Sequence, residues 1–207
     1  MKENIKISLP EDISDITLEQ SQKYLAIIKR DDIDVNNKTK RIIGLFTGLK
    51  RRDVELIDMV DYDAIVNQIN KALDSDVEFK HRFTLNGVEY GFVPKLDEIT
   101  AGEYIDLASY SNSPETLNKV LAVLFRPIIL SDAFGNYEIE SYSANSDYAD
   151  IMMQAPMNIV NGMLVFFCLL SSELQIHTLK YIATVRAEAR LKQVITLRNG
   201  DGTRRWI

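Results

Sequence analysis

The feature that most constrains the fold of this chain is an Asn-Gly pair between two runs of strand-forming residues. Phe79–Leu85 and Val88–Val93 are rich in aromatic and β-branched residues, and Asn86-Gly87 separates them. Asn-Gly supplies the two positive φ angles that a type I′ turn requires. We therefore predict an antiparallel hairpin over residues 79–93. The residues expected on its hydrophobic face are Phe83, Leu85, Val88, Tyr90 and Phe92.

Helical signals lie on both sides of this hairpin. Thr17 with Gln20, and Thr100 with Glu103, have the spacing of a capping box, which predicts helices from about Thr17 to Arg30 and from Thr100 onward. The other expected elements are a strand over 5–9, a helix over 41–47 ended by Gly48, one or two helices over 51–73 with a break around Asp61, a helix from Ser113-Pro114 to near Arg126-Pro127, a hairpin or extended loop between 128 and 143, and a short helix over 147–153.

The longest helix is expected from Ile159 to about Arg190. Its stretch from Met163 to Leu170 is apolar on every side, so we expect it in the core or at a contact between subunits. Cys168 lies in this stretch and is expected to be a small core residue. A membrane span needs about 20 consecutive apolar residues, and this stretch is shorter, so no membrane association is expected.

These patterns predict a mainly helical α+β fold, in which helices pack with a central β-hairpin and a long C-terminal helix. Residues 1–179 are expected to form a single domain, and residues 180–207 a basic helix end and tail. The chain has 207 residues, 30 acidic and 24 basic, and a single cysteine, which excludes a disulfide framework. No apolar targeting segment follows Met1, so we expect a cytoplasmic protein.

Motifs that carry catalysis or bind metals are missing from the sequence. His81 and His177 have no metal-ligand spacing, and we interpret both as ordinary structural or surface histidines. The acidic runs at 31–34 and 58–63 do not follow the order of a calcium loop and are expected to be solvated loops or helix caps. Gly44–Lys50 has the wrong spacing for a phosphate loop. We therefore expect no catalytic residue, no metal, no cofactor and no enzymatic activity.

The C-terminal segment is the strongest candidate for a binding site. Residues 180–207 hold seven basic and two acidic residues, a net charge of +5, whereas the whole chain carries −6. Three interpretations stay open: the basic residues complement the negative end of a helix, they bind an acidic protein partner, or they contact nucleic acid. Nucleic acid is the least favoured of the three, because the net charge of the segment is small. The candidate partner-binding residues are Arg186, Arg190, Lys192, Arg204, Arg205 and Trp206.

Four stretches together resemble a group of proteins from tailed bacteriophages. They are Phe46–Leu49 with Asp53-Val54, Phe83–Leu107, Val120–Pro127 and Met157–Phe167. The group is encoded among virion and tail morphogenesis genes and is sometimes likened to tail assembly chaperones.

This resemblance implies a non-enzymatic morphogenesis protein that binds other phage structural or tail proteins, in the cytoplasm of an infected bacterium. The first alternative is a structural subunit retained in the virion, in the neck, the tail or the capsid interior, and a homo-oligomer fits either reading. A small phage enzyme or a nucleic-acid-binding protein is the least favoured alternative.

Overall fold

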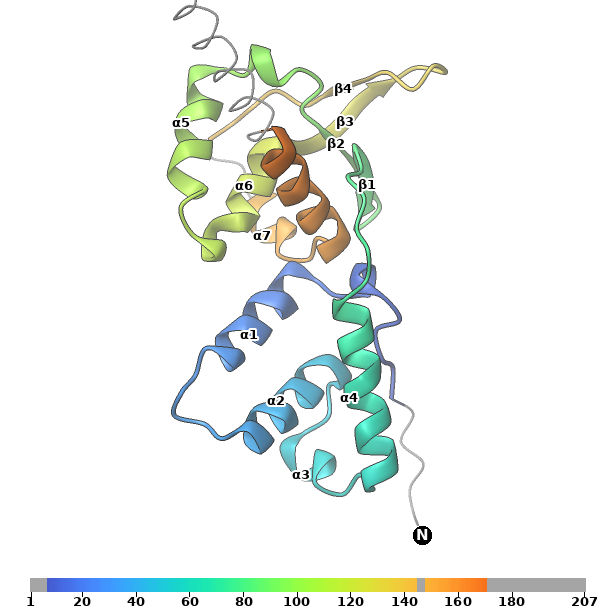
Figure 1. Ribbon diagram of the computed structural model, residues 1–207. Coiled ribbons are helices and arrows are strands. Elements are labelled where there is room, and N and C mark those ends of the chain that lie inside the picture. Colours follow the sequence, from blue (N-terminus) through green and yellow to red (C-terminus); the bar gives the residue numbers. More distant parts are fainter. Residues whose placement is uncertain (1–6, 145–147, 171–207) are drawn as a thin grey trace, which may run out of the picture. The chain divides into compact units, whose positions relative to one another are not determined.

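The computed structural model describes residues 7–144 and 148–170 (Figure 1). The chain divides into two units between Met163 and Leu164, and each is described by itself. Several predicted features lie outside the described residues. They are Ile5-Lys6, the long helix beyond Leu170, His177, the predicted boundary at 179/180 and the six candidate residues of the tail.

The N-terminal part of the described chain is helical. After a short 3-10 turn, η1 (Ile13–Asp15), come α1 (Leu18–Ile28), α2 (Val35–Thr47), α3 (Arg51–Val54) and α4 (Met59–Leu73). The capping box predicted before α1 is confirmed, since Gln20 N donates to Thr17 Oγ1 at 3.2 Å and Thr17 N donates to Gln20 Oε1 at 3.0 Å. The α1 to α4 helices bury a common apolar set: Leu18, Ile43, Phe46, Val54, Ile65, Ile69 and Ala72.

The acidic runs serve as helix caps, as predicted. Asp34 and Asp58 are the N-caps of α2 and α4, accepting bonds from Asn37 N and Asp61 N, both at 3.0 Å. A break between two helices is present as predicted, but it covers residues 55–58 and Asp61, where it was expected, lies in the first turn of α4. Gly48, with φ of 72°, ends α2 as predicted, and α2 begins at Val35, a turn and a half earlier than the predicted start.

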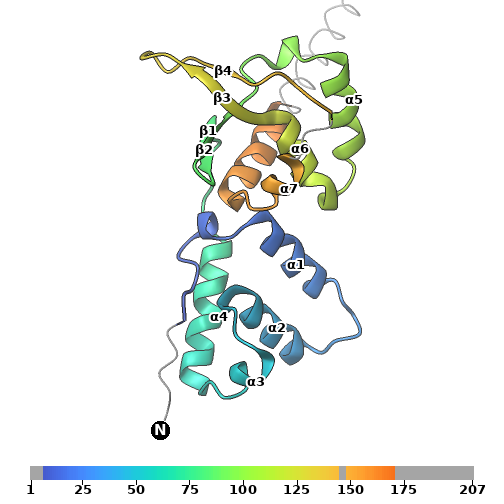
Figure 2. The same cartoon turned by 180° about the vertical axis from the view of Figure 1, so that it is seen from behind.

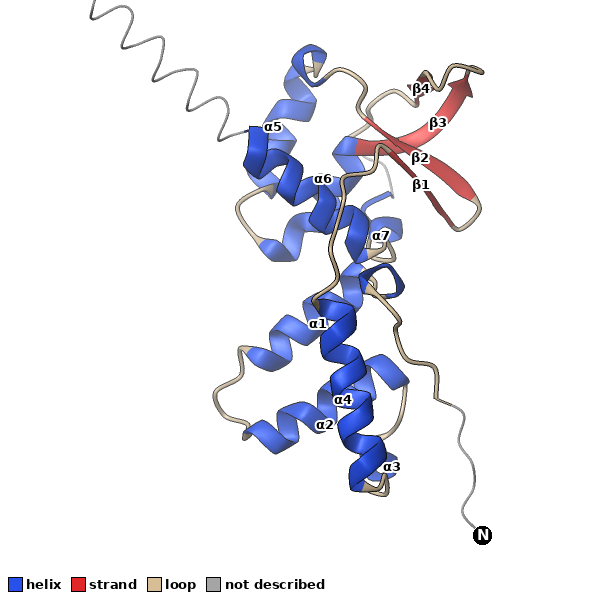
Figure 3. Ribbon diagram, turned by 45° about the vertical axis from the view of Figure 1, so that its right-hand side comes forward, coloured by secondary structure: helices blue, strands red, loops and turns tan. Residues whose placement is uncertain are grey.

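Four antiparallel strands form one sheet in the order β1-β2-β3-β4 (Figure 3). The strands are β1 (Arg82–Leu85), β2 (Val88–Phe92), β3 (Phe125–Ser131) and β4 (Tyr137–Ile139). The predicted Asn-Gly turn joins β1 to β2, with φ of 51° at Asn86 and 79° at Gly87. The predicted hairpin is thus confirmed, and β3 with β4 forms the second hairpin anticipated between 128 and 143.

The hydrophobic face of the first hairpin is largely the predicted one. Leu85, Tyr90 and Phe92 are buried. Phe83 pairs with Tyr90 across the strands and stacks on its ring at 5.5 Å between centroids. Val88, beside the turn, is 41% exposed and does not join the buried face.

A group of helices packs beside the sheet. It comprises α5 (Ala101–Tyr110), α6 (Leu117–Leu124), α7 (Tyr148–Met152) and a helical segment over residues 157–163. The helix that begins at Met157 includes every described residue up to Leu170, and its residues from Leu164 onward belong to the second unit. Two 3-10 turns, η2 (Leu96–Glu98) and η3 (Pro114–Thr116), precede α5 and α6. From Asn118 onward, every residue of α6 except Lys119 is buried, which makes it the central helix of this group. Pro114 starts η3 behind the Ser113 cap, as predicted for a helix start, and α6 gives way to β3 at Phe125.

The α1 helix is joined to the start of the 157–170 helix by main-chain bonds. Thr17 forms an isolated bridge with Pro156, Leu18 N donates to Ala155 O at 2.9 Å, and Met157 N donates to Ile16 O at 2.8 Å. Ile16, between these bonds, has no exposed surface. The helical N-terminal part is therefore attached to the rest of its unit through backbone pairing, as well as through side chains.

Two sequence predictions are wrong in the described residues. Cys168 is exposed, so its predicted place in the core is wrong. In the Met163–Leu170 stretch, Met163 is 1% exposed, whereas Leu164, Val165 and Leu169 are 42%, 46% and 61% exposed, so the core position holds only at Met163. The alternative predicted for this stretch, a contact between subunits, stays a prediction. Residues 7–9 of the predicted strand are irregular. An alternating pattern makes a strand possible, but a strand forms only where a neighbouring strand offers hydrogen-bond partners.

Among the described residues, no helix is both long enough and apolar enough to cross a membrane.

Candidate partner-binding groove

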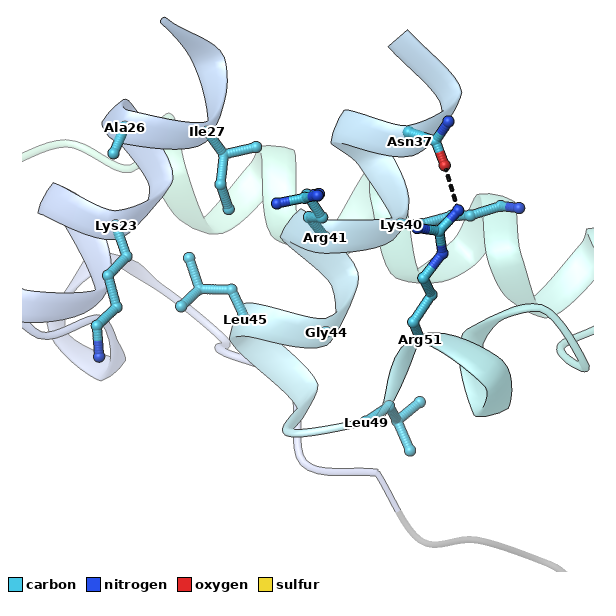
Figure 4. Close-up of a pocket in the computed structure, with 10 residues that line it drawn as sticks. All are labelled: Lys23, Ala26, Ile27, Asn37, Lys40, Arg41, Gly44, Leu45, Leu49 and Arg51. Atoms are coloured by element: carbon cyan, nitrogen blue, oxygen red, sulfur yellow. Dashed lines mark hydrogen bonds between the residues drawn. The ribbon is translucent and has the colours of Figure 1, made fainter. Parts of the chain in front are cut away.

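A groove of about 480 Å³ lies between α1 and α2 and reaches the start of α3 (Figure 4). Its walls come from three separate parts of the sequence, and we call it the cationic groove. The residues that line it are Lys23, Ala26, Ile27, Asn37, Lys40, Arg41, Gly44, Leu45, Leu49 and Arg51.

The floor of the cationic groove is apolar. Ile27 of α1 and Leu45 of α2 point toward each other, and Leu49 extends the apolar surface past the end of α2 (Figure 4). Gly44 allows this arrangement, since a Cβ at that position would lie 2.9 Å from Leu49 O, closer than real Cβ atoms come to backbone. The floor therefore offers a site for aliphatic or aromatic side chains of a ligand.

Four cations form the rim, and three of them are held by neighbouring side chains. Lys23 Nζ lies 2.6 Å from Glu19 Oε1, and Lys40 Nζ lies 3.1 Å from Glu55 Oε1. Arg51 donates to Asn37 Oδ1 at 2.9 Å (Figure 4), and its Nε lies 3.5 Å from Glu55 Oε1. Hydrogen bonds from Lys23 and Lys40 lower the pKa values of Glu19 and Glu55, so both carboxylates are charged at neutral pH.

Arg41 is the rim cation that differs from the others. It is exposed, and within the part of the chain that the structure describes it has no carboxylate within ion-pairing distance. Two carboxylates thus contact three of the four cations, and the cationic groove keeps a local positive charge on an acidic protein. This local field favours an anionic ligand or an acidic peptide.

The cationic groove has the chemistry of a binding site. Its lining combines the apolar side chains of the floor with the four cations of the rim. An apolar floor beneath a cationic rim fits an amphipathic protein segment whose apolar side chains are flanked by Asp or Glu.

A second hollow, of about 410 Å³, is polar and lies around Asp12, Asp76, Glu78 and Lys80. Asn158 also lines it, and its Oδ1 is buried without a hydrogen-bond partner. No cluster of three potential metal ligands occurs among the described residues.

His81, interpreted from the sequence as a structural or surface histidine, lies in the part of the chain that the structure describes. Its ring contacts those of Phe79 and Phe92 at centroid distances of 4.7 and 6.2 Å, and its carbonyl accepts a bond from Phe92 N at 2.8 Å. These contacts fit a structural residue at the start of the first hairpin. His177 and the six predicted partner-binding residues of the tail lie outside the described residues.

The cationic groove was not predicted from the sequence, although α2 carries a usable signal. Asn37, Lys40, Arg41, Gly44 and Leu45 recur at spacings of three and four residues, which places cations and apolar side chains on one helix face. That mixed stripe indicates a face that is neither fully buried nor fully solvated.

Comparisons of the chain with protein-family models, with curated proteins and with solved structures found no significant match.

Proposed function

We propose that this chain is a non-enzymatic bacteriophage morphogenesis protein that binds another phage protein, in the manner of a tail assembly chaperone. The observation that carries the proposal is the cationic groove, with its apolar floor of Ile27, Leu45 and Leu49. On its rim stands Arg41, which has no carboxylate within ion-pairing distance among the described residues. Its phage context rests on the sequence resemblance. The cationic groove supports binding to an acidic amphipathic segment, which is what a factor that holds another protein during assembly requires.

Photo-crosslinking in infected cells tests the proposal. A photoreactive amino acid in place of Leu45, on the floor, is expected to form an adduct with a phage-encoded protein other than this chain itself, identified by mass spectrometry of the adduct. Arg41→Glu in the same chain is expected to abolish this adduct, because it places a like charge against the acidic segment. Arg52→Glu is the matched control, since Arg52 is 81% exposed at its side chain and does not line the cationic groove.

Two results would contradict the proposal: adducts with host proteins alone, or a phage adduct that Arg41→Glu leaves unchanged. The first alternative, a structural subunit retained in the particle, is separated by a second measurement. Mass spectrometry of purified particles is expected to find this chain absent if it is an assembly factor, and present in a fixed ratio to tail or capsid proteins if it is a structural subunit.

A further inference from the structure

The end of the β3–β4 hairpin is an apolar projection with no cover in the described chain. We call residues 129–138 the finger; Figures 1 and 2 show it extending beyond the helices and the other strands. Ile129, Leu130 and Phe134 of the finger are 64%, 61% and 92% exposed. Large exposed apolar side chains on a projecting hairpin, two in β3 and one in the loop after it, are typical of a contact surface.

The tip of the finger is held in one conformation by hydrogen bonds. Asp132 Oδ1 accepts from Phe134 N at 2.9 Å and from Asn136 N at 2.8 Å, and its Oδ2 accepts from Asn136 Nδ2 at 2.6 Å. Gly135 takes φ of 90°, which this turn requires and which L side chains rarely adopt. The tip is therefore ordered around Phe134 without burying the Phe134 ring.

Side chains at the base of the finger add further support. Arg82 of β1 donates to Gly135 O at 2.7 Å, and its guanidinium lies 4.4 Å from the centre of the Tyr137 ring. Tyr137 in turn donates to Phe92 O at 2.7 Å. A rigidly presented aromatic side chain loses little conformational entropy on binding, which is why such residues serve as anchors of protein interfaces.

We propose that the finger of one copy of this chain docks in the cationic groove of a second copy. The two surfaces are complementary in shape and chemistry: a projecting Phe134 meets a concave floor formed by Ile27 and Leu45. They are also complementary in charge, because Asp132 and Glu138 are exposed acidic residues of the finger, and Arg41 is the rim cation without an ion-pair partner in the described chain. An arginine over an aromatic ring adds a cation–π contact to this pairing.

This self-association goes beyond the proposed function, and it occupies the same cationic groove. A phage partner and the finger of a second copy therefore compete, so that self-association covers the apolar floor until a partner replaces it. Because self-association is measured on the purified chain alone, its failure and the failure of the phage-partner proposal are distinguishable.

Sedimentation velocity of the purified full chain over a wide range of concentrations is the test. The wild-type chain is expected to form dimers or larger species as its concentration rises. Phe134→Ala is expected to raise the dissociation constant of this association at least about tenfold, which is the usual effect of removing an interface anchor. Arg41→Glu, with Lys23→Glu as a second variant of the cationic groove, is expected to weaken it similarly. Val60→Ala is the matched control, since Val60 is 79% exposed and belongs to neither surface.

Mixing the variants gives the decisive result. Phe134→Ala keeps an intact groove and Arg41→Glu keeps an intact finger, so the two monomeric variants are expected to form a 1:1 complex that neither forms alone. A wild-type chain that is monomeric at every concentration overturns the proposal. So does an oligomer that survives either variant, or a mixture of variants that stays monomeric. Circular dichroism of each variant checks that it is folded.

Discussion

At the residue scale, Glu103 has two roles that the sequence pattern does not separate. Its Oε2 accepts bonds from Thr100 N at 2.6 Å and Thr100 Oγ1 at 2.7 Å, which completes the capping box of α5. Its Oε1 lies 2.8 Å from Arg126 of β3, and the two side chains are only 5% and 9% exposed. One carboxylate therefore caps a helix and neutralises a buried guanidinium, which ties α5 to the sheet.

Glu103→Gln is expected to lower the free energy of unfolding by about 3 kcal/mol, because the amide leaves the buried Arg126 charge without a counter-ion. Urea unfolding measures the change. Adding Arg126→Met to Glu103→Gln is expected to restore part of the loss, since no buried charge is left. Lys23→Gln, which breaks the exposed pair with Glu19, is the control and is expected to cost less than about 1 kcal/mol. An equal loss of unfolding free energy in Glu103→Gln and in Lys23→Gln would contradict this account.

Asp32 provides a pH prediction on the surface. A hydrogen bond from Arg30 lowers the pKa of Asp32 from its usual 3.8 to about 2. Because the pKa is lowered in the folded chain, any stabilisation from this pair is present above 3.8 and is lost as the pH falls toward 2. Both side chains are about half exposed or more, so no measurable change in stability is expected.

An NMR titration of the Asp32 carboxyl carbon is therefore expected to show a midpoint of about 2 in the wild-type chain. In Arg30→Gln the midpoint is expected to move back toward 3.8 while the melting temperature stays the same. A wild-type midpoint near the usual value would show that the pair does not persist in solution.

At the element scale, two helical glycines make opposite predictions. A Cβ on Gly162 would lie 2.7 Å from Glu78 O and 3.0 Å from Phe79 Cα, both backbone atoms that cannot move aside cheaply. A Cβ on Gly102 would lie 3.6 Å from the Tyr142 ring, an ordinary contact. The helix from Met157 thus packs closely on residues 78–79, whereas the start of α5 has room.

Gly162→Ala is expected to lower the free energy of unfolding by about 1–3 kcal/mol, the usual cost of overpacking. Gly102→Ala is expected to be neutral or to stabilise by up to about 1 kcal/mol, since alanine is the better helix former. Thermal unfolding of the two variants side by side measures both effects. Similar behaviour of the two variants would mean that the close approach at Gly162 does not exist in solution.

The elements that were predicted correctly from the sequence are those whose signal lies within a few neighbouring residues. Asn86-Gly87, Gly48 and the Thr17 and Thr100 capping boxes each determine a turn or a cap through bonds to near neighbours, and each is confirmed. The prediction for Cys168 failed because an apolar run has the same sequence whether or not other elements cover it.

The cationic groove illustrates the same limit. Lys23, Arg41 and Arg51 lie on different helices, and they meet only because α1, α2 and α3 pack on one another. The residues on one face of a single helix can be predicted from their spacing, as on α2. Which helix lies opposite that face across a groove depends on tertiary packing, which spacing does not reveal. The Glu103–Arg126 pair was missed for the same reason, although the capping role of Glu103 was predicted.

At the scale of the whole molecule, charge is divided unevenly along the chain. The full chain carries −6 and residues 180–207 carry +5, so residues 1–179 carry −11. The cationic groove is a local exception within this acidic body. Complementary charge mainly speeds and orients docking, so a basic segment on an acidic protein would direct it toward acidic partners.

Truncation after Thr178 tests this role of the C-terminal segment. The shortened chain loses its basic residues and carries −11, so it is expected to be attracted less to an acidic partner and to give a lower yield of the Leu45-site adduct in infected cells. Its melting temperature is expected to match that of the full chain. Replacing Lys180 and the six other basic residues with Gln, in a chain of full length, is the charge-specific control and is expected to reduce the yield similarly. A truncated chain that unfolds would place the segment in the core, and one that forms the adduct normally would show that its charge does not guide binding.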